Sequence, residues 1–177
     1  MNLENNKSEN IGRIPYKYNN ETIYEWEQNI EDVIIYIKLP PVLLPENKEI
    51  VKSNLKLGEK MPKLEIKFSS KRLSVGISGN PPYLNHELFS NIKDSECIWC
   101  IEDKEAVITL PKAIKAETWK CAFKGHNQLN DFQVEEVKKK ILKERFQEEH
   151  SGFDFSDAQI NGNVPDPKKF LGGLNYK

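Results

Sequence analysis

The stretch Val33-Ile34-Ile35-Tyr36-Ile37-Lys38-Leu39 decides the fold. It is β-branched and aromatic and its odd-numbered residues are all apolar, which predicts a strand with one buried face. Tyr24 to Gln28 alternates in the same way, and Asn29 to Asp32 between the two runs is short enough for a hairpin turn. Pro40 and Pro41 end the second strand because they remove two ladder donors. The stretch therefore predicts two neighbouring antiparallel strands.

Six further apolar runs follow at close spacing, separated by reversal-favouring stretches such as Gly79-Asn80-Pro81-Pro82. The runs are Leu64 to Phe68, Leu73 to Ile77, Leu88 to Ile92, Ile98 to Ile101, Val107 to Leu110 and Trp119 to Phe123. With the first two, about eight short strands in about a hundred residues is the spacing of a sandwich. The sequence predicts an all-β fold, a seven- or eight-stranded antiparallel β-sandwich.

Helical periodicity begins only after Asn130, where apolar residues recur among charged ones at steps typical of one helix face. These apolar residues are Val134, Val137, Ile141, Leu142 and Phe146. Asn130 with Gln133 is a capping pair, and Gly152 is a natural stop. The pattern predicts one amphipathic helix after the sandwich.

Composition divides the chain into four segments. Residues 1–20 hold too few apolar side chains to offset the entropy of ordering, which predicts a loose, disordered N-terminal arm. Residues 21–125 form the sandwich, residues 126–151 carry the helix, and residues 152–177 form a tail with several Gly and Pro. Within the sandwich, residues 41–62 are expected to form an inserted loop with partial structure.

The charge balance excludes partners that a global electrostatic field would attract. Lys and Arg total 26 against 27 Asp and Glu, a net charge of -1, so neither nucleic acid nor a membrane surface is expected as a partner. No run approaches the roughly 18 apolar residues of a membrane span, and the N-terminus lacks a signal-peptide pattern. We expect a cytoplasmic protein.

The sequence contains no nucleophile elbow, phosphate loop, dinucleotide fingerprint or zinc-protease motif, so we expect no catalytic residue, metal or cofactor. Cys97 and Cys100 provide the alternative from another class, a thiol redox enzyme, since their spacing is that of a dithiol pair. In an extended run, however, residues three apart point to opposite faces of the sheet. We therefore predict ordinary thiols.

Two segments are candidates for protein binding. Lysines recur every fourth position at Lys48, Lys52, Lys56 and Lys60, which on a helix would form a basic stripe, either a solvated face or an interaction patch. Phe153-Asp154-Phe155-Ser156 places two phenylalanines beyond the helix stop in a polar tail, so they must either dock on the domain or contact a partner.

The three tryptophans, Trp26, Trp99 and Trp119, lie in three separate predicted strands. Large aromatic side chains dominate core energetics, and we interpret all three as core anchors rather than as a ligand-binding face.

Several motifs stand in the order and spacing of a known family. They are Tyr24-x-Trp26-x-Gln28, then Val75-Gly76-Ile77-x-Gly79-x-Pro81-Pro82 with Glu87-Leu88, then Trp99-x-Ile101-Glu102-Asp103, and Leu110-Pro111-Lys112 before Trp119. Over about residues 21 to 125 they resemble the CS domain of the NudC family, whose sandwich is similar to that of small acidic co-chaperones of heat-shock protein 90. A second block, from Leu142 to Asn163, resembles the C-terminal segment of one member of that family.

The resemblance implies a non-enzymatic co-chaperone without a cofactor. Its partners would be heat-shock protein 90 and client proteins, with dynein regulators and β-propeller domains among the clients. A chaperone-independent adaptor or scaffold is the alternative within binding proteins. The structural family positions are Trp26, Gln28, Gly79, Pro82, Trp99, Glu102, Asp103 and Trp119.

The sequence departs from the family pattern at three places. His86 replaces a usual glycine before Glu87-Leu88, which predicts a rebuilt turn because His at positive φ costs more than Gly. Lys120 replaces the second ring of a Trp pair, and the 41–62 loop is longer than the family's usual connection.

Overall fold

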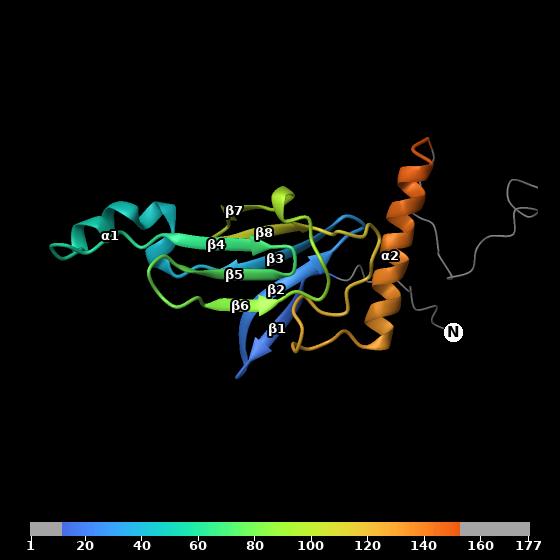
Figure 1. Cartoon of the computed structure of the whole chain (residues 1–177), viewed down its shortest axis with the longest axis horizontal. Coiled ribbons are helices and arrows are strands. Elements are labelled where there is room, and N and C mark those ends of the chain that lie inside the picture. The colour runs from blue at the N-terminus through green and yellow to red at the C-terminus, as the bar shows by residue number, and fades with distance from the viewer. Residues whose placement is uncertain (1–11, 153–177) are drawn as a thin grey trace, which may run out of the picture.

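The computed structural model describes residues 12–152, in which eight strands form two antiparallel sheets. One sheet has the order β1-β2-β3-β8-β7, with the strands Ile14–Tyr18, Glu21–Gln28, Asp32–Lys38, Glu105–Pro111 and Ile98–Glu102. The other has the order β4-β5-β6, with the strands Leu64–Ser69, Arg72–Ile77 and Leu84–Glu87. The sheets stack as two layers (Figure 1), so the predicted antiparallel β-sandwich is confirmed.

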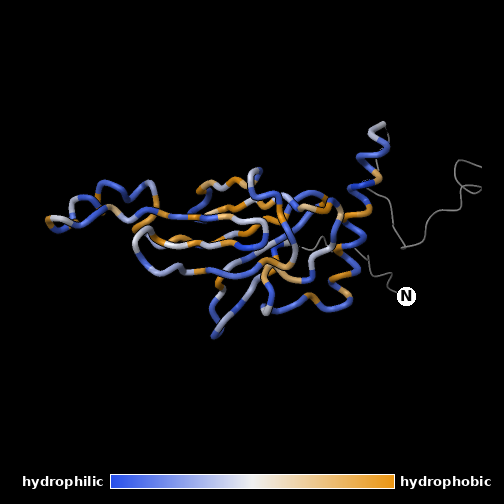
Figure 2. Tube along the Cα trace, in the orientation of Figure 1, coloured by the Kyte–Doolittle hydropathy of each residue, from blue (hydrophilic) through white to orange (hydrophobic). Residues whose placement is uncertain are grey.

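The alternation of apolar residues places one face of each strand in a shared core. Val33 and Ile35 of β3 lie opposite Leu110 and Ile108 of β8, and all four are fully buried. Leu73 of β5 belongs to the same cluster and comes from the other layer. Figure 2 shows hydrophobic residues interspersed with hydrophilic ones along the strands. The core therefore lies between the layers.

Two helices and three 3₁₀ turns complete the described part of the chain. They are α1 (Lys48–Asn54), α2 (Asp131–Glu149) and the 3₁₀ turns Pro41–Leu43, Pro45–Asn47 and Asp94–Glu96. In Figure 1, α2 stands across one end of the sandwich, and α1 projects from the opposite end. Within residues 12–152, no helix has the length and apolar character needed to cross a membrane.

Helix α2 begins as its sequence predicts. The Asn130 side chain accepts from the Gln133 backbone N–H, and the Gln133 side chain accepts from the Asn130 N–H, a complete capping box. Val134, Val137 and Ile141 are buried. The helix therefore packs its apolar face on the end of the sandwich, consistent with the predicted periodicity.

The predicted loose arm is wrong for Ile14–Tyr18, which forms strand β1. Tyr16 lies opposite Tyr24 of β2, and the two rings stack with centroids 5.1 Å apart. Ile14 packs against the core. Backbone pairing with β2 and two half-buried side chains supply the stabilisation that the composition of the arm does not reveal. Residues 1–11 lie outside the described residues.

Two predicted strands are also wrong. Residues 88–92 and 119–123 are largely buried but irregular. One isolated bridge, Leu88↔Phe123, joins the two segments, and a second joins Ile92 to Lys112. The two segments are connections that cover the end of the sandwich. Their apolar residues are there because the segments are buried, and a short apolar run of this kind resembles a strand in the sequence. The strand in this region, β6, ends at Glu87 and includes His86. The predicted turn at His86 is therefore wrong, and its φ is not positive.

Candidate protein-binding surfaces

A buried amide organises the segment between β8 and α2. Gln28, at the end of β2, is 3 % exposed; its Nε2 donates to the Trp119 carbonyl (2.7 Å), and its Oε1 accepts from the Trp119 backbone N–H (2.9 Å). This two-way bond fixes Trp119, whose ring is fully buried. A Gln side chain substitutes here for a strand partner and satisfies backbone groups that would otherwise be unpaired.

Lys112 is the second buried polar side chain of this region, and its role was not predicted from the sequence. Its Nζ donates to Gln28 Oε1 (3.2 Å), to the Asn29 carbonyl (2.7 Å) and to the Glu117 carbonyl (2.7 Å). Burial lowers the pKa of Lys112 to about 8, so the ammonium still predominates at neutral pH. Its three protons match three acceptors, and the charge holds the β8–α2 connection against β2.

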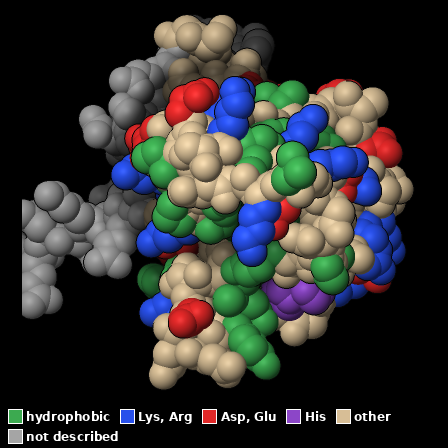
Figure 3. Space-filling view, turned by 90° about the vertical axis from the view of Figure 1, so that its left-hand side faces the viewer, with side chains coloured by type: hydrophobic (Ala, Val, Ile, Leu, Met, Phe, Trp, Pro, Cys, Tyr) green, Lys and Arg blue, Asp and Glu red, His purple; other side chains and the backbone are tan. Residues whose placement is uncertain are grey.

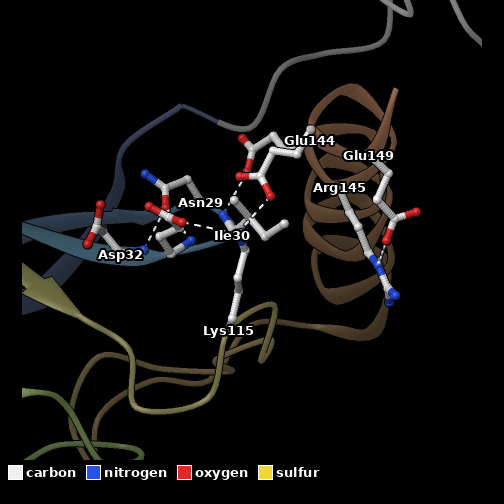
Figure 4. A network of polar contacts seen from close by, with 9 residues as sticks. Asn29, Ile30, Asp32, Lys115, Glu144, Arg145 and Glu149 are labelled. Carbon is white, nitrogen blue, oxygen red and sulfur yellow. Dashed lines mark hydrogen bonds and ion pairs between the residues drawn. The ribbon is translucent and has the colours of Figure 1, made fainter. Parts of the chain in front are cut away.

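Polar contacts attach α2 to the turn between β2 and β3 (Figure 4). Glu144 Oε2 accepts from the Ile30 backbone N–H (2.7 Å). Lys115 pairs with Glu148 of α2 (2.7 Å) and with Glu31 of the turn (3.1 Å). A groove of about 410 Å³ separates this turn from the helix, with Glu144 and Glu148 on its helical wall. The helix is therefore part of the domain rather than an appendage.

The prediction that Trp99 is a core anchor is wrong, whereas Trp26 and Trp119 are buried as predicted. Trp99 is 40 % exposed and its neighbour Ile98 is 66 % exposed, both on β7. Trp99 lies opposite the buried Ile108 and so faces the interior, but β7 is the last strand of its sheet and the other layer does not cover the ring fully. Sequence periodicity indicates a strand but not whether it is an edge.

The cysteine pair lacks the features of a redox site. Cys97 precedes β7 and is partly buried against the core, whereas Cys100 within β7 is exposed, so the two thiols occupy different environments. Burial, with the charges of Asp94 and Glu96, raises the pKa of Cys97 to about 11, away from thiolate formation. Among the described residues, no group of three or more His, Cys, Asp or Glu is arranged to hold a metal ion.

The lysine row does not form one helical stripe. Lys48 and Lys52 lie on α1, but the helix ends at Asn54, and Lys56 and Lys60 follow in irregular chain. All four are exposed. Figure 3 views the molecule from the α1 end and shows Lys and Arg side chains interspersed with hydrophobic and acidic ones rather than gathered in one field. Phe153, Asp154 and Phe155 lie outside the described residues.

The sequence of the sandwich matches a known domain family. The CS domain profile matches residues 22–112, about half of the chain. The chain belongs to the CS domain family. The predicted resemblance to NudC proteins is confirmed by relatives that carry that name.

The relatives of this CS domain protein match at low identity. It is 26% identical to Protein BOBBER 1 of Arabidopsis thaliana over 89% of this chain and 59% of that protein. It is 26% identical to NudC domain-containing protein 2 of Homo sapiens over 78% of this chain and 80% of that protein. It is 33% identical to the nuclear migration protein nudC of Drosophila melanogaster over 66% of this chain. The chain spans only 32% of the length of that last relative.

The remaining family positions sit in the turns of the CS domain. Gly79 follows β5 with φ +87, a conformation that L side chains rarely adopt. A Cβ on Gly76 would lie 2.9 Å from the Pro82 Cα, so the chain at Pro82 packs directly on the glycine backbone. Glu102 ends β7, and Asp103 occupies the following turn at positive φ. Gly79 and Pro82 therefore shape the turn after β5, whereas Glu102 and Asp103 are exposed at the end of β7.

Proposed function

We propose that this chain is a non-enzymatic co-chaperone that binds heat-shock protein 90 and client proteins in the cytosol. The observation that carries the proposal is the CS domain, which spans residues 22–112 and whose relatives are NudC proteins. Client proteins with β-propeller domains and dynein regulators are the first candidates.

The geometry supports a binding module that works without a chemical step. The sandwich, the Lys112 contacts and the docked α2 provide a rigid frame. Ile98 and Trp99 present apolar surface on that frame, and aromatic side chains in such positions are enriched at protein interfaces. Such a module acts by equilibrium binding and has no requirement for ATP.

Light scattering of an unfolding model client tests this function. We expect the full chain to suppress aggregation without ATP and to bind purified heat-shock protein 90 in calorimetry. Aggregation unchanged at molar excess, together with retained binding to heat-shock protein 90, would favour an adaptor. Loss of both would refute the co-chaperone function.

We also propose Phe153, Asp154 and Phe155 as partner contacts, because two phenylalanines in a polar segment provide apolar surface suited to an interface. The double variant Phe153→Ala with Phe155→Ala should leave the melting temperature unchanged and reduce capture of heat-shock protein 90 or of clients by about tenfold. Lys168→Ala is the matched control in the same segment. A lower melting temperature with full capture would assign the pair to the domain's own packing.

A further inference from the structure

Strand β7 is an exposed edge whose outer backbone has no partner among the described residues. It pairs with β8 and lies at the end of the five-stranded sheet. Asp103 and Lys104 join the two strands with φ values of 46 and 66, the signature of a two-residue hairpin turn. In such a hairpin the flanking residues exchange both hydrogen bonds, and bonded pairs then alternate. The N–H and C=O groups of Trp99 and Ile101 therefore point to the free edge.

The other sheet edges carry features that discourage pairing. Strand β1 contains Pro15, which has no N–H, and its register shifts between Tyr16 and Lys17. Strand β4 exposes Glu65 and Lys67, and β6 has only four residues. Strand β7 has neither proline nor lysine and instead exposes Ile98 and Trp99. Of the four edges, β7 is the one that remains open to strand addition.

The charges around β7 select among strands that could add to it. Asp94 and Glu96 precede the strand, and Glu102 and Asp103 follow it. The nearby cations are fewer: Lys93 pairs with Glu96 (3.6 Å), and Lys104 pairs with Glu46 of the loop (3.5 Å). The apolar centre of the edge thus has a carboxylate-rich region at each end.

This pattern disfavours a second copy of the chain. An antiparallel β7·β7 pair would bring the Glu96 end of one strand against the Glu102 end of the other, so like charges would meet at both ends. The same pattern complements a segment with Lys or Arg on both sides of an apolar, strand-forming centre.

We propose that β7 binds such a basic-flanked, extended segment of a partner protein by strand addition. The backbone N–H and C=O groups of Trp99 and Ile101 form the hydrogen bonds to the added strand, and the Trp99 ring provides apolar contact. The carboxylates at the two ends of β7 set the register of the added strand. The inference rests on the proposed protein-binding function and names its ligand chemistry.

Fluorescence anisotropy with the full chain and a labelled peptide KKVTVTVKK tests the proposal. We expect binding that weakens with salt and that weakens at least tenfold for EEVTVTVEE or for a peptide N-methylated along its pairing edge. Trp99→Lys should abolish binding. Phe132→Lys, on a side chain of α2 that is 72 % exposed, is the matched control and should bind like the wild type. Unchanged melting temperatures show that each variant is folded.

Charge reversal gives the sharper test. Glu96→Lys with Glu102→Lys should invert the preference, so that the acidic-flanked peptide binds better than the basic-flanked one. Hydrogen exchange should show new protection at the Trp99 and Ile101 amides of the wild type when KKVTVTVKK binds. Equal binding of the two peptides, or protection elsewhere, would overturn the proposal.

Other occupants of the edge have their own signatures. Concentration-dependent dimers that the peptide dissociates would assign β7 to a second copy. Edge protection without peptide that is lost on deleting residues 168–177 would assign it to the chain's own basic end. Either result overturns the proposal. If Trp99→Lys still protects clients and binds heat-shock protein 90, only the proposed role of the β7 edge is refuted. If the wild type binds the peptide at β7 but shows neither activity, only the co-chaperone function is refuted.

Discussion

Lys112 shows how one residue can hold a connection that has no regular structure of its own. The residue is 2 % exposed, and its ammonium bonds to three oxygen atoms from the end of β2 and from the segment that leads to Trp119. A buried charge is tolerated only when it is fully hydrogen-bonded, and here every proton has an acceptor. The same contacts place Gln28 between the lysine and the Trp119 backbone. Lys112 therefore positions Gln28 and the connection to Trp119 as well as stabilising the fold.

Lys112→Met tests this role. The methionine keeps much of the apolar volume but leaves the Asn29 and Glu117 carbonyls without the lysine donor, while Gln28 Oε1 keeps only its bond from the Trp119 N–H. The free energy of unfolding should therefore fall by about 2–4 kcal/mol. Urea denaturation measures the loss. Lys120→Met, on an exposed lysine nearby, should change stability by less than about 0.5 kcal/mol. Equal stability of the two variants would show that the buried ammonium contributes no net stabilisation.

The pH dependence of Cys97 reactivity distinguishes a structural thiol from a redox thiol. Because its pKa is raised to about 11, only about 0.1 % of Cys97 is thiolate at pH 8. In a Cys100→Ser background, iodoacetamide labelling of Cys97 should therefore rise about tenfold per pH unit from pH 8 to pH 10. A rate that reaches its plateau below pH 8 would revive the thiol enzyme. Capture of partners by Cys97→Ser with Cys100→Ser should match the wild type, since the two thiols share no function.

At the scale of elements, β1 is attached through an aromatic cluster with two histidines. The His126 ring stacks on Tyr16 at 4.0 Å, and the Tyr24 hydroxyl lies 2.8 Å from His126 Nδ1. His86 of β6 meets the same ring at 4.7 Å. Burial, and then the proximity of His86, lowers the pKa of His126 below its ordinary value of 6.5. The neutral imidazole therefore suits the folded protein better than the imidazolium.

This cluster predicts a loss of stability in mild acid. The folded pKa of His126 is below the unfolded one, so its contribution is complete above about pH 6.5 and declines as pH falls through the folded pKa. Wild type should lose more urea resistance between pH 7 and pH 5 than His126→Asn, because carboxylate titrations are common to both. His86→Asn should show a smaller pH effect than wild type. Parallel pH profiles for wild type and His126→Asn would contradict the assignment.

How far the sequence predicts the elements depends on what each pattern encodes. Alternation located β2, β3, β5 and β8 well because their buried faces are regular. It missed β1, whose pairing depends on β2 and not on its own composition. It also placed strands at residues 88–92 and 119–123, where burial comes from packing over the sandwich end. Local pattern cannot distinguish a buried connection from a buried strand.

The candidate surfaces were harder to predict than the elements. The sequence identified Trp99 as important but placed it in the core, since edge position is a property of strand order and not of local pattern. Glu144 was part of a recognised motif, yet its bond to the Ile30 N–H connects residues far apart in the chain. Gln28 and Trp119 were named as structural positions, and both are buried. The sequence therefore indicated which residues matter, whereas the residues that they contact became clear only from the fold.

At the scale of the whole molecule, α2 shares the hydrophobic core of the sandwich. Val134, Val137 and Ile141 belong to the same hydrophobic cluster as Leu110 and Trp119. Removing α2 would expose this end of the core and leave the Ile30 N–H without Glu144. The resemblance covers about residues 21–125, and the contacts of α2 continue the packed structure beyond them.

A chain that ends at residue 125 should therefore fail to fold stably. Burial of three large apolar side chains contributes about 1.5–3 kcal/mol each, and their loss approaches the about 5–15 kcal/mol by which a typical domain is stable. A chain that ends at Gly152 keeps these contacts and should melt cooperatively, close to the full chain. Circular dichroism melts of the three lengths measure the difference. If the chain ending at residue 125 melted like the full chain, α2 would be an independent appendage and its contacts with the turn between β2 and β3 would have no energetic role.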